Sequence, residues 1–283
     1  MRRHHIIILF LVLAVISLCA FEWPLNSGSI RYGFGSFRDG FLKGTEFGAA
    51  NSMVRAVAEG ELVFVATGRS LPGGYPIHGG SMLSLAHPAE MVSVYTGMVP
   101  DSISRYLVKV KAGDVLGRTP DAGGRLGARL FTYDGKERRF VNPLMVLPGV
   151  RDDMVPVIRS TSLKNDGGVV RIDQTRIIKQ GIYDVILEVY DNSPAGEQSA
   201  PFEIAVTLDG SVRARVVYDA SWAKDGMPFI FGSAGLEEDA YLLGENRVRF
   251  GPYVFPRGRV VLSISVLDFT GNKREQTYSL SVQ

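Results

Sequence analysis

The sequence predicts a mainly β protein in two domains, and three observations lead to this fold class. Glycine (32 residues) and proline (14 residues) recur every few positions, and both interrupt helices. Short β-branched and aromatic runs lie between them, and the apolar residues show almost no helical period. Beyond residue 155, apolar and polar residues alternate with a period of two. This alternation is typical of antiparallel strands with one buried face.

Length and charge limit the classes of function. A chain of 283 residues is long enough for one large domain or two ordinary ones. The 31 basic and 29 acidic residues are mixed along the chain and leave a net charge of +2. Nucleic-acid binding requires a concentrated basic face, so we expect no nucleic-acid partner. The single cysteine, Cys19, excludes a disulfide within the chain.

Residues 1–20 differ in character from the rest of the chain. Arg2 and Arg3 precede an unbroken apolar run, Ile6 to Ile16. This order predicts a signal peptide cleaved near Ala20, and therefore an exported protein of the periplasm or cell envelope with no membrane span after signal removal. A retained anchor and lipidation at Cys19 are the alternatives.

A domain boundary is predicted near residue 150, where NPLMVLPG (142–149) is followed by a short charged link. The predicted domains are therefore residues 21–150 and 151–283. The strands expected in the first domain are Glu61–Ala66, Met82–Ala86, Met91–Tyr95 and Leu107–Leu116, the last broken by a glycine turn.

The second domain is predicted to be an immunoglobulin-like β-sandwich. Its alternating runs bring apolar residues to one face, and Asp209-Gly210 and Gly271-Asn272 provide the turns between strands. The residues expected on buried faces are Tyr183, Val185, Leu187 and Val189; Phe202, Ile204, Val206 and Leu208; Val212, Ala214, Val216 and Tyr218; Val260, Leu262, Ile264 and Val266; and Tyr278, Leu280 and Val282.

Five segments of the first domain, taken in chain order, carry a resemblance to a known family. They read RYGFGSFRDGFLKGTEFGAA (31–50), VRAVAEGELVFVATG (54–68), GGSMLSLAHPAEMVSVYTGM (79–98), VKAGDVLGRTP (110–120) and LGARLFTYDGKERRFVNPLMVL (126–147). Together they resemble the LytM or lysostaphin-type endopeptidase domain (peptidase M23-like, duplicated hybrid motif). The Val-Asn-Pro-Leu ending is the most specific part. The resemblance implies a LytM-type β-sheet sandwich followed by the immunoglobulin-like sandwich.

The resemblance also implies a chemistry that this chain lacks the residues to perform. Members of the family cut peptide cross-links of peptidoglycan with one zinc ion held by two histidines and one aspartate. The family's ligand and catalytic positions are occupied here by Leu42, Glu46, Gly97, Arg129 and Phe131. A catalytic zinc needs three protein ligands and an open position. We therefore expect no zinc and no other cofactor, and no catalytic residue.

Two interpretations of the altered cleft remain open. Arg38, Lys43, Glu46 and Arg129 would line the groove, where cationic groups suit ligands that carry carboxylates. Alternatively, Arg129 and Glu46 form an internal ion pair that fills the former metal position.

Three further groups of residues each allow two interpretations, one functional and one structural. His78 and His87, with Glu90 nearby, form a new metal or acid–base site or are structural. Asp191, Asp209 and Asp268 bind calcium or, more simply, stabilise turns. An aromatic group provides a recognition surface or covers the end of the sandwich; its members are Tyr241, Phe250, Tyr253 and Phe255.

Three functions follow from these expectations. The first is a non-catalytic module that binds or regulates peptidoglycan or a peptidoglycan hydrolase, as degenerate domains of the family do. The second is an active zinc endopeptidase acting on peptidoglycan cross-links. The third is a structural β-sandwich protein that serves only protein–protein contact.

Overall fold

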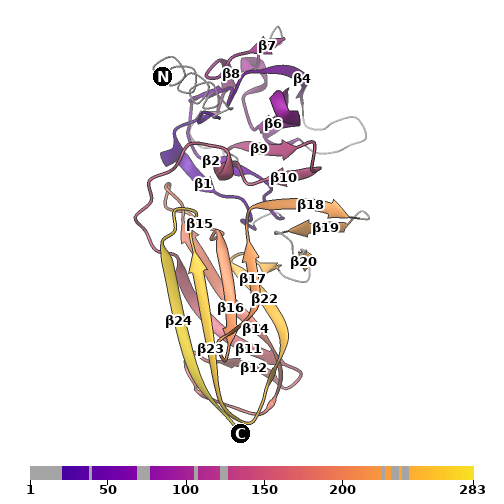
Figure 1. Ribbon diagram of the computed structural model, residues 1–283. Helices are drawn as coiled ribbons and strands as arrows, with labels where there is room; N and C mark the ends of the chain where they lie inside the picture. The colour runs from indigo at the N-terminus through magenta and orange to yellow at the C-terminus, as the bar shows by residue number, and fades with distance from the viewer. Residues whose placement is uncertain are drawn as a thin grey trace, which may run out of the picture.

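The structure, a computed structural model, describes residues 21–37, 40–68, 77–104, 108–121, 127–224, 227–230, 236–237 and 242–283. The signal-peptide prediction, Arg38 and Tyr241 lie outside the described residues. The molecule is elongated, with the N-terminal strands at one end and the C-terminus at the other (Figure 1). Among the described helices, none is long and apolar enough to cross a membrane.

The fold is nearly all β, as predicted, because helices are limited to single 3₁₀ turns. In the described residues these turns are η1 (Ser27–Ser29), η2 (His78–Gly80), η3 (Pro88–Glu90), η4 (Pro100–Ser102) and η5 (Pro143–Met145). Proline begins three of them, where its missing N–H costs nothing. Asn142 caps η5 by accepting a hydrogen bond from the Leu144 amide at 3.0 Å.

The N-terminal half is built on a sheet in which β10, β9, β6, β5, β4 and β7 are successive neighbours and β2 joins β1 to β9. A small separate sheet pairs β3 with β8. The strands are β1 (Ile30–Tyr32), β2 (Thr45–Phe47), β3 (Met53–Arg55), β4 (Gly60–Thr67), β5 (Ser81–Ala86), β6 (Met91–Thr96), β7 (Lys109–Val110), β8 (Val115–Arg118), β9 (Ala128–Asp134) and β10 (Arg139–Val141). The first three runs predicted as strands are confirmed as β4, β5 and β6.

The C-terminal half is a sandwich of two sheets that share one hydrophobic core. One sheet contains β11 (Val157–Asn165), β12 (Gly168–Arg171), β14 (Gly181–Asn192), β15 (Gln198–Ser199), β21 (Leu242–Gly244) and β22 (Arg247–Phe255). The other contains β13 (Ile177–Ile178), β16 (Glu203–Leu208), β17 (Ser211–Val217), β23 (Gly258–Leu267) and β24 (Lys273–Val282). Its likeness to an immunoglobulin domain stays a prediction.

The alternation in the sequence is confirmed in most of the sandwich and fails at one strand. Every residue of the set from Val260 to Val266 is at most 1% exposed. Val212 is 64% exposed, because the pairing of β16 with β17 shifts register between Val206 and Thr207. A shift of one residue moves a side chain to the opposite face. The turn prediction holds, since Asp209 and Gly210 both have positive φ (49° and 78°).

The aromatic group of the second domain belongs mainly to the core. Phe250 is 3% exposed and Phe255 is fully buried, so the exposed-surface interpretation is wrong for these two residues. Tyr253 is partly buried and packs against the same core.

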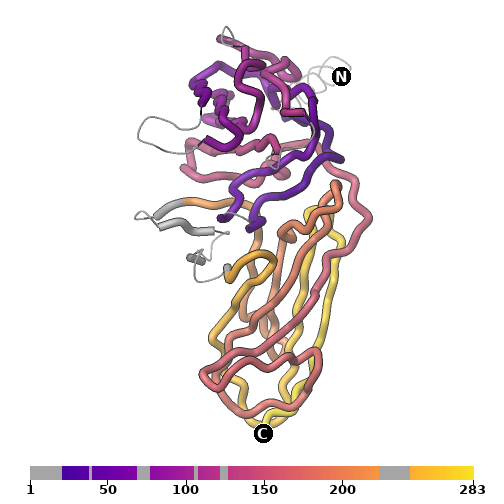
Figure 2. The backbone as a smooth tube through the Cα atoms, turned by 180° about the vertical axis from the view of Figure 1, so that it is seen from behind, coloured from indigo at the N-terminus to yellow at the C-terminus, as the bar shows by residue number. Residues whose placement is uncertain are grey.

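A segment of the C-terminal half completes the N-terminal sheet. β18 (Ala220–Lys224) pairs with β10, and β19 (Met227–Ile230) and β20 (Leu236–Glu237) continue the sheet outward. In Figure 2 the orange tube of β18 runs beside the N-terminal strands rather than within the sandwich. The division into two domains at residue 150 stays a prediction. β10 and β18 lie on opposite sides of this boundary in the sequence and are paired in one sheet.

Candidate functional site

The register of three strands gathers the polar residues of the cleft. Glu46 of β2 lies directly opposite Arg129 of β9, and Arg129 lies opposite Thr96 of β6 on its other side. Directly opposed residues project to the same face of a sheet. Residues far apart in the sequence therefore share one face of the N-terminal sheet.

Glu46 and Arg129 form a buried ion pair. Arg129 Nε donates to Glu46 Oε2 at 2.7 Å. Glu46 is 4% exposed, and the Arg129 side chain is 23% exposed. Arg31 adds a weaker contact, with a guanidinium nitrogen 3.9 Å from Glu46 Oε1. A carboxylate this deeply buried requires such partners, and loss of one partner of a buried pair typically costs about 3–5 kcal/mol.

A cavity of about 290 Å³ lies beside the ion pair. Its wall includes Leu42, Lys43, Glu46, Arg129 and Phe131, so the structure brings together five of the residues that the sequence placed in the cleft. Aromatic rings form much of the remainder. Phe140 contacts Phe131 edge-on with ring centroids 6.4 Å apart, and Lys43 Nζ lies 5.8 Å from the Phe140 centroid.

The backbone around Gly97 leaves no room for a side chain. Gly97 has a φ of +78°, a left-handed conformation that favours glycine. A Cβ atom there would lie 2.6 Å from the Gly127 carbonyl oxygen. The position where the family resemblance implies a catalytic histidine is thus filled by neighbouring backbone.

The two histidines outside residues 1–20 both hydrogen-bond to carbonyl oxygens. His87 Nδ1 lies 2.7 Å from the Glu59 carbonyl oxygen, and His78 Nε2 lies 3.0 Å from that of Gly127. A carbonyl oxygen only accepts, so both nitrogens carry hydrogen and are occupied as donors. His87 is 7% exposed, and its burial lowers its pKa below the usual value, an effect that the bond to Glu59 partly offsets. These contacts favour the structural interpretation of both histidines.

The residues of the cleft do not fit a catalytic zinc ion. Leu42 and Phe131 have no donor atom, and the Glu46 carboxylate is held by a guanidinium group. A fixed positive charge beside the position opposes metal binding. Within the described part of the chain, only one group of three metal-ligating side chains lies close together, namely Asp152, Asp191 and Asp268, which lie outside this cleft.

Sequence reasoning missed two features. Arg31 contacts both Glu46 and Glu197, which belong to opposite halves of the molecule. The sequence grouped Asp209 with Asp191 and Asp268, and placed Asp152 only in the charged link between the domains. In the structure it is Asp152 that lies with Asp191 and Asp268. Asp209 is elsewhere, where its Oδ1 accepts a hydrogen bond from the Val261 amide at 2.7 Å.

Comparisons with known proteins give distant matches. A family model with no functional description matches residues 155–283, and no curated protein matches the sequence. Among solved structures, a zinc-containing peptidase from Vibrio cholerae is 18% identical over 40% of this chain and 36% of its own, with a TM-score of 0.29. Lysostaphin is 14% identical over 91% and 96%, with a TM-score of 0.34. Pseudoalterin, an M23 metalloprotease from the deep sea, is 9% identical over 78% and 99%, with a TM-score of 0.28.

These likenesses are distant in sequence and in structure. The alignment spans little more than a third of the Vibrio cholerae peptidase. Identities below 20% and TM-scores near 0.3 leave the function of this chain to be argued from its own residues.

Proposed function

We propose that this protein is an exported, non-catalytic relative of the LytM-type peptidases. It acts in the cell envelope as a module that binds peptidoglycan or a peptidoglycan hydrolase. The five-segment resemblance supports the relationship, and the character of residues 1–20 supports export. The C-terminal sandwich, which we interpret as immunoglobulin-like, adds no activity of its own.

The Glu46–Arg129 ion pair is the observation that carries the non-catalytic part of the proposal. A zinc peptidase polarises a bound water, and the metal that does so needs three ligands and an open position. Among the described residues, Glu46 is the one carboxylate that lines the cleft, and it is buried against a guanidinium group at 2.7 Å. The alternative of an active zinc endopeptidase requires ligands that these positions do not supply.

The cavity supports a binding role. Lys43 places a positive charge on its wall beside the Glu46–Arg129 ion pair. Phe41, Phe131 and Phe140 provide flat apolar surfaces. Such a wall suits a peptide that bears carboxylates, as the stem peptides of peptidoglycan do. The third function, a purely structural interaction protein, would need no such cavity.

The first experiment measures zinc content and peptidoglycan digestion on one sample of the purified exported protein. We expect substoichiometric zinc and no release of cross-links. Near-stoichiometric zinc with released cross-links would instead establish the active endopeptidase.

Binding is then measured by co-sedimentation with purified peptidoglycan. Lys43→Gln should weaken binding about tenfold, since a hydrogen bond to a charged group contributes about 1.5–3 kcal/mol. Lys111→Gln is the matched control, because Lys111 is exposed in the turn between β7 and β8 and should leave binding unchanged. No sedimentation of the folded wild type would argue for a hydrolase partner or for the purely structural role.

A further inference from the structure

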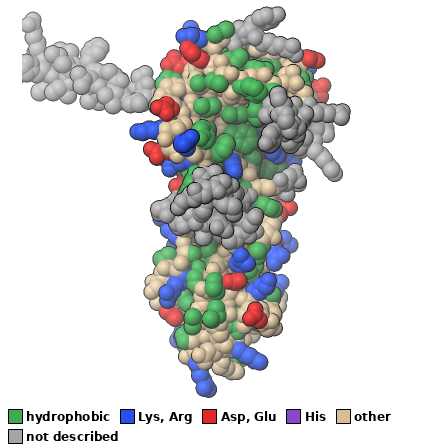
Figure 3. Space-filling view, turned by 90° about the vertical axis from the view of Figure 1, so that its right-hand side faces the viewer, with side chains coloured by type: hydrophobic (Ala, Val, Ile, Leu, Met, Phe, Trp, Pro, Cys, Tyr) green, Lys and Arg blue, Asp and Glu red, His purple; other side chains and the backbone are tan. Residues whose placement is uncertain are grey.

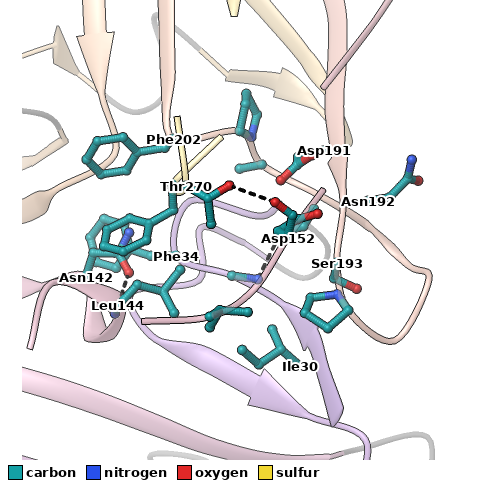
Figure 4. Close-up of a pocket in the computed structure, with 17 residues that line it drawn as sticks. Ile30, Phe34, Asn142, Leu144, Asp152, Asp191, Asn192, Ser193, Phe202 and Thr270 are labelled. Carbon is teal, nitrogen blue, oxygen red and sulfur yellow. Dashed lines mark hydrogen bonds between the residues drawn. The ribbon is translucent and has the colours of Figure 1, made fainter. Parts of the chain in front are cut away.

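Three aspartates from separate segments meet where the two halves of the molecule join. Asp152 lies in the link before β11, Asp191 lies near the end of β14, and Asp268 directly follows β23. One carboxylate oxygen from each lies within 4.8 Å of the others. Figure 4 shows Asp152 and Asp191 side by side at the wall of the pocket between the halves.

Among the described residues, no basic side chain forms an ion pair with any of the three aspartates. The nearby Arg151 pairs with Asp153 at 3.2 Å. Burial, followed by the charges of Asp268 and Asp152, raises the pKa of Asp191 to about 7. Three carboxylates held this close repel one another unless a proton or a cation lies among them.

A second observation is an unsatisfied atom inside the group. Asp191 Oδ1 is buried from solvent and has no hydrogen-bond partner among the described residues. A buried polar atom in this condition destabilises the fold. A cation bound among the three carboxylates would supply the partner.

The other two aspartates are held in place from outside the group. Asp268 Oδ1 accepts hydrogen bonds from the Thr270 and Asn272 amides, both at 2.8 Å. The Asn272 side chain donates to Asp268 Oδ2 at 2.7 Å and to the peptide oxygen of Asp152 at 2.9 Å. Asp268 and the link that contains Asp152 are therefore fixed to each other before any ion binds.

The type and number of the ligands favour one ion. Carboxylate oxygens suit a hard divalent cation, and calcium lies 2.3–2.6 Å from each ligand. The three carboxylate oxygens lie within 4.8 Å of one another, close enough to share one such ion. Magnesium keeps several of its waters and is usually bound through only one or two carboxylates, so a group of three carboxylates favours calcium. The adjoining cavity of about 70 Å³ has room for the waters that complete the coordination shell.

We propose that Asp152, Asp191 and Asp268 bind one calcium ion. The ion would tie the interdomain link to one strand of each sheet of the sandwich. Calcium would thereby stabilise the joint between the two halves, independently of the cleft around Glu46.

The test is isothermal titration of the calcium-depleted exported protein with CaCl₂ and, separately, with MgCl₂, together with thermal melting. We expect one calcium ion per chain and a melting temperature raised by about 5–10 °C when free calcium exceeds Kd 100-fold. Calcium should also slow tryptic cleavage after Arg151, whose side chain is 90% exposed. Absence of binding at millimolar calcium, or an equal response to magnesium, would overturn the assignment.

Two matched variants distinguish calcium binding by the three aspartates from a merely structural role of these residues. Asp191→Asn should abolish the calcium response and, in EDTA, melt no lower than the wild type, because it removes a buried negative charge without changing shape. Asp153→Asn alters the neighbouring residue, whose partner is Arg151, and should keep the full calcium response. A calcium response that survives in Asp191→Asn would place the ion elsewhere and refute the proposal.

Discussion

A chain of hydrogen bonds through the N-terminal core shows what single residues contribute. The Val57 amide donates to the Tyr95 hydroxyl at 2.9 Å, and this hydroxyl lies 3.2 Å from Ser93 Oγ. Ser93 Oγ lies 2.7 Å from His87 Nε2. Because His87 Nδ1 donates to the Glu59 carbonyl oxygen, Nε2 of the neutral ring accepts from Ser93. Burial raises the pKa of Tyr95 to about 12, so its hydroxyl keeps its proton.

The buried histidine makes stability depend on pH. The pKa of His87 is lowered in the folded state, so below the unfolded value of about 6.5 the unfolded chain binds more protons than the folded one. The free energy of unfolding should therefore fall as pH drops below about 6.5, by at most about 1.4 kcal/mol per pH unit, and level off below the folded pKa.

Urea denaturation across pH 7 to 4.5 measures this effect. His87→Gln should flatten the dependence in this window, although it lowers stability at neutral pH by removing ring contacts such as that with Phe21, 5.2 Å between centroids. An equally steep dependence in the variant would assign the effect to another group.

At the scale of elements, β18 extends the N-terminal sheet beyond β10. Ser221 is fully buried and lies between Phe140 of β10 and Ile230 of β19. β18, β19 and β20 thus belong to a sheet whose other described strands all precede residue 142. In β4 of the same sheet, some apolar side chains remain exposed, such as Val63 (63%) and Phe64 (41%). Figure 3 shows apolar side chains gathered on the N-terminal half.

A proline in β18 tests the role of this strand. Ser221→Pro removes an N–H from the interior of a sheet, where proline is not tolerated. We expect a loss of about 1–3 kcal/mol in the free energy of unfolding, the cost of an unpaired buried polar group. Amide hydrogen exchange in β10 should become faster. Ser221→Ala keeps the N–H, and exchange in β10 that rises equally in this control would contradict the prediction.

At the scale of the whole molecule, several contacts join the two halves. The backbone N–H of Asn142 donates to the carbonyl oxygen of Asp219 at 2.7 Å. The side-chain amide of Asn142 donates to the carbonyl oxygen of Tyr218 at 2.8 Å. Arg31 lies within 4.0 Å of Glu46 in one half and Glu197 in the other. With the pairing of β18, these contacts favour one cooperative unit over two independent domains.

Calorimetry of the protein without residues 1–20 measures this cooperativity. We expect a single unfolding transition whose calorimetric enthalpy equals its van't Hoff enthalpy. Ser221→Pro should separate it into two transitions, because the strand that crosses between the halves is lost. Two well-separated transitions in the wild type would show that the halves unfold independently.

The sequence by itself determined the β class, most strands and the buried faces of the sandwich. These properties depend on residues two positions apart, as in β23, where Val260, Leu262 and Ile264 are buried. The sequence also placed Leu42, Lys43, Glu46, Arg129 and Phe131 in one cleft, but only through a resemblance to a family, and their binding role stays a prediction.

Only the tertiary structure decided which charged side chains lie close together and which strands complete the N-terminal sheet. Arg31 reaches Glu197, and Asp152 joins Asp191 and Asp268, across long separations in the chain. The exposure of Val212 and the pairing of β18 with β10 depend on strand register. Such contacts are decided by the packing of whole sheets, since burial leaves each carboxylate only the partners that distant segments bring to it. The alternation of apolar and polar residues along one strand does not determine those partners.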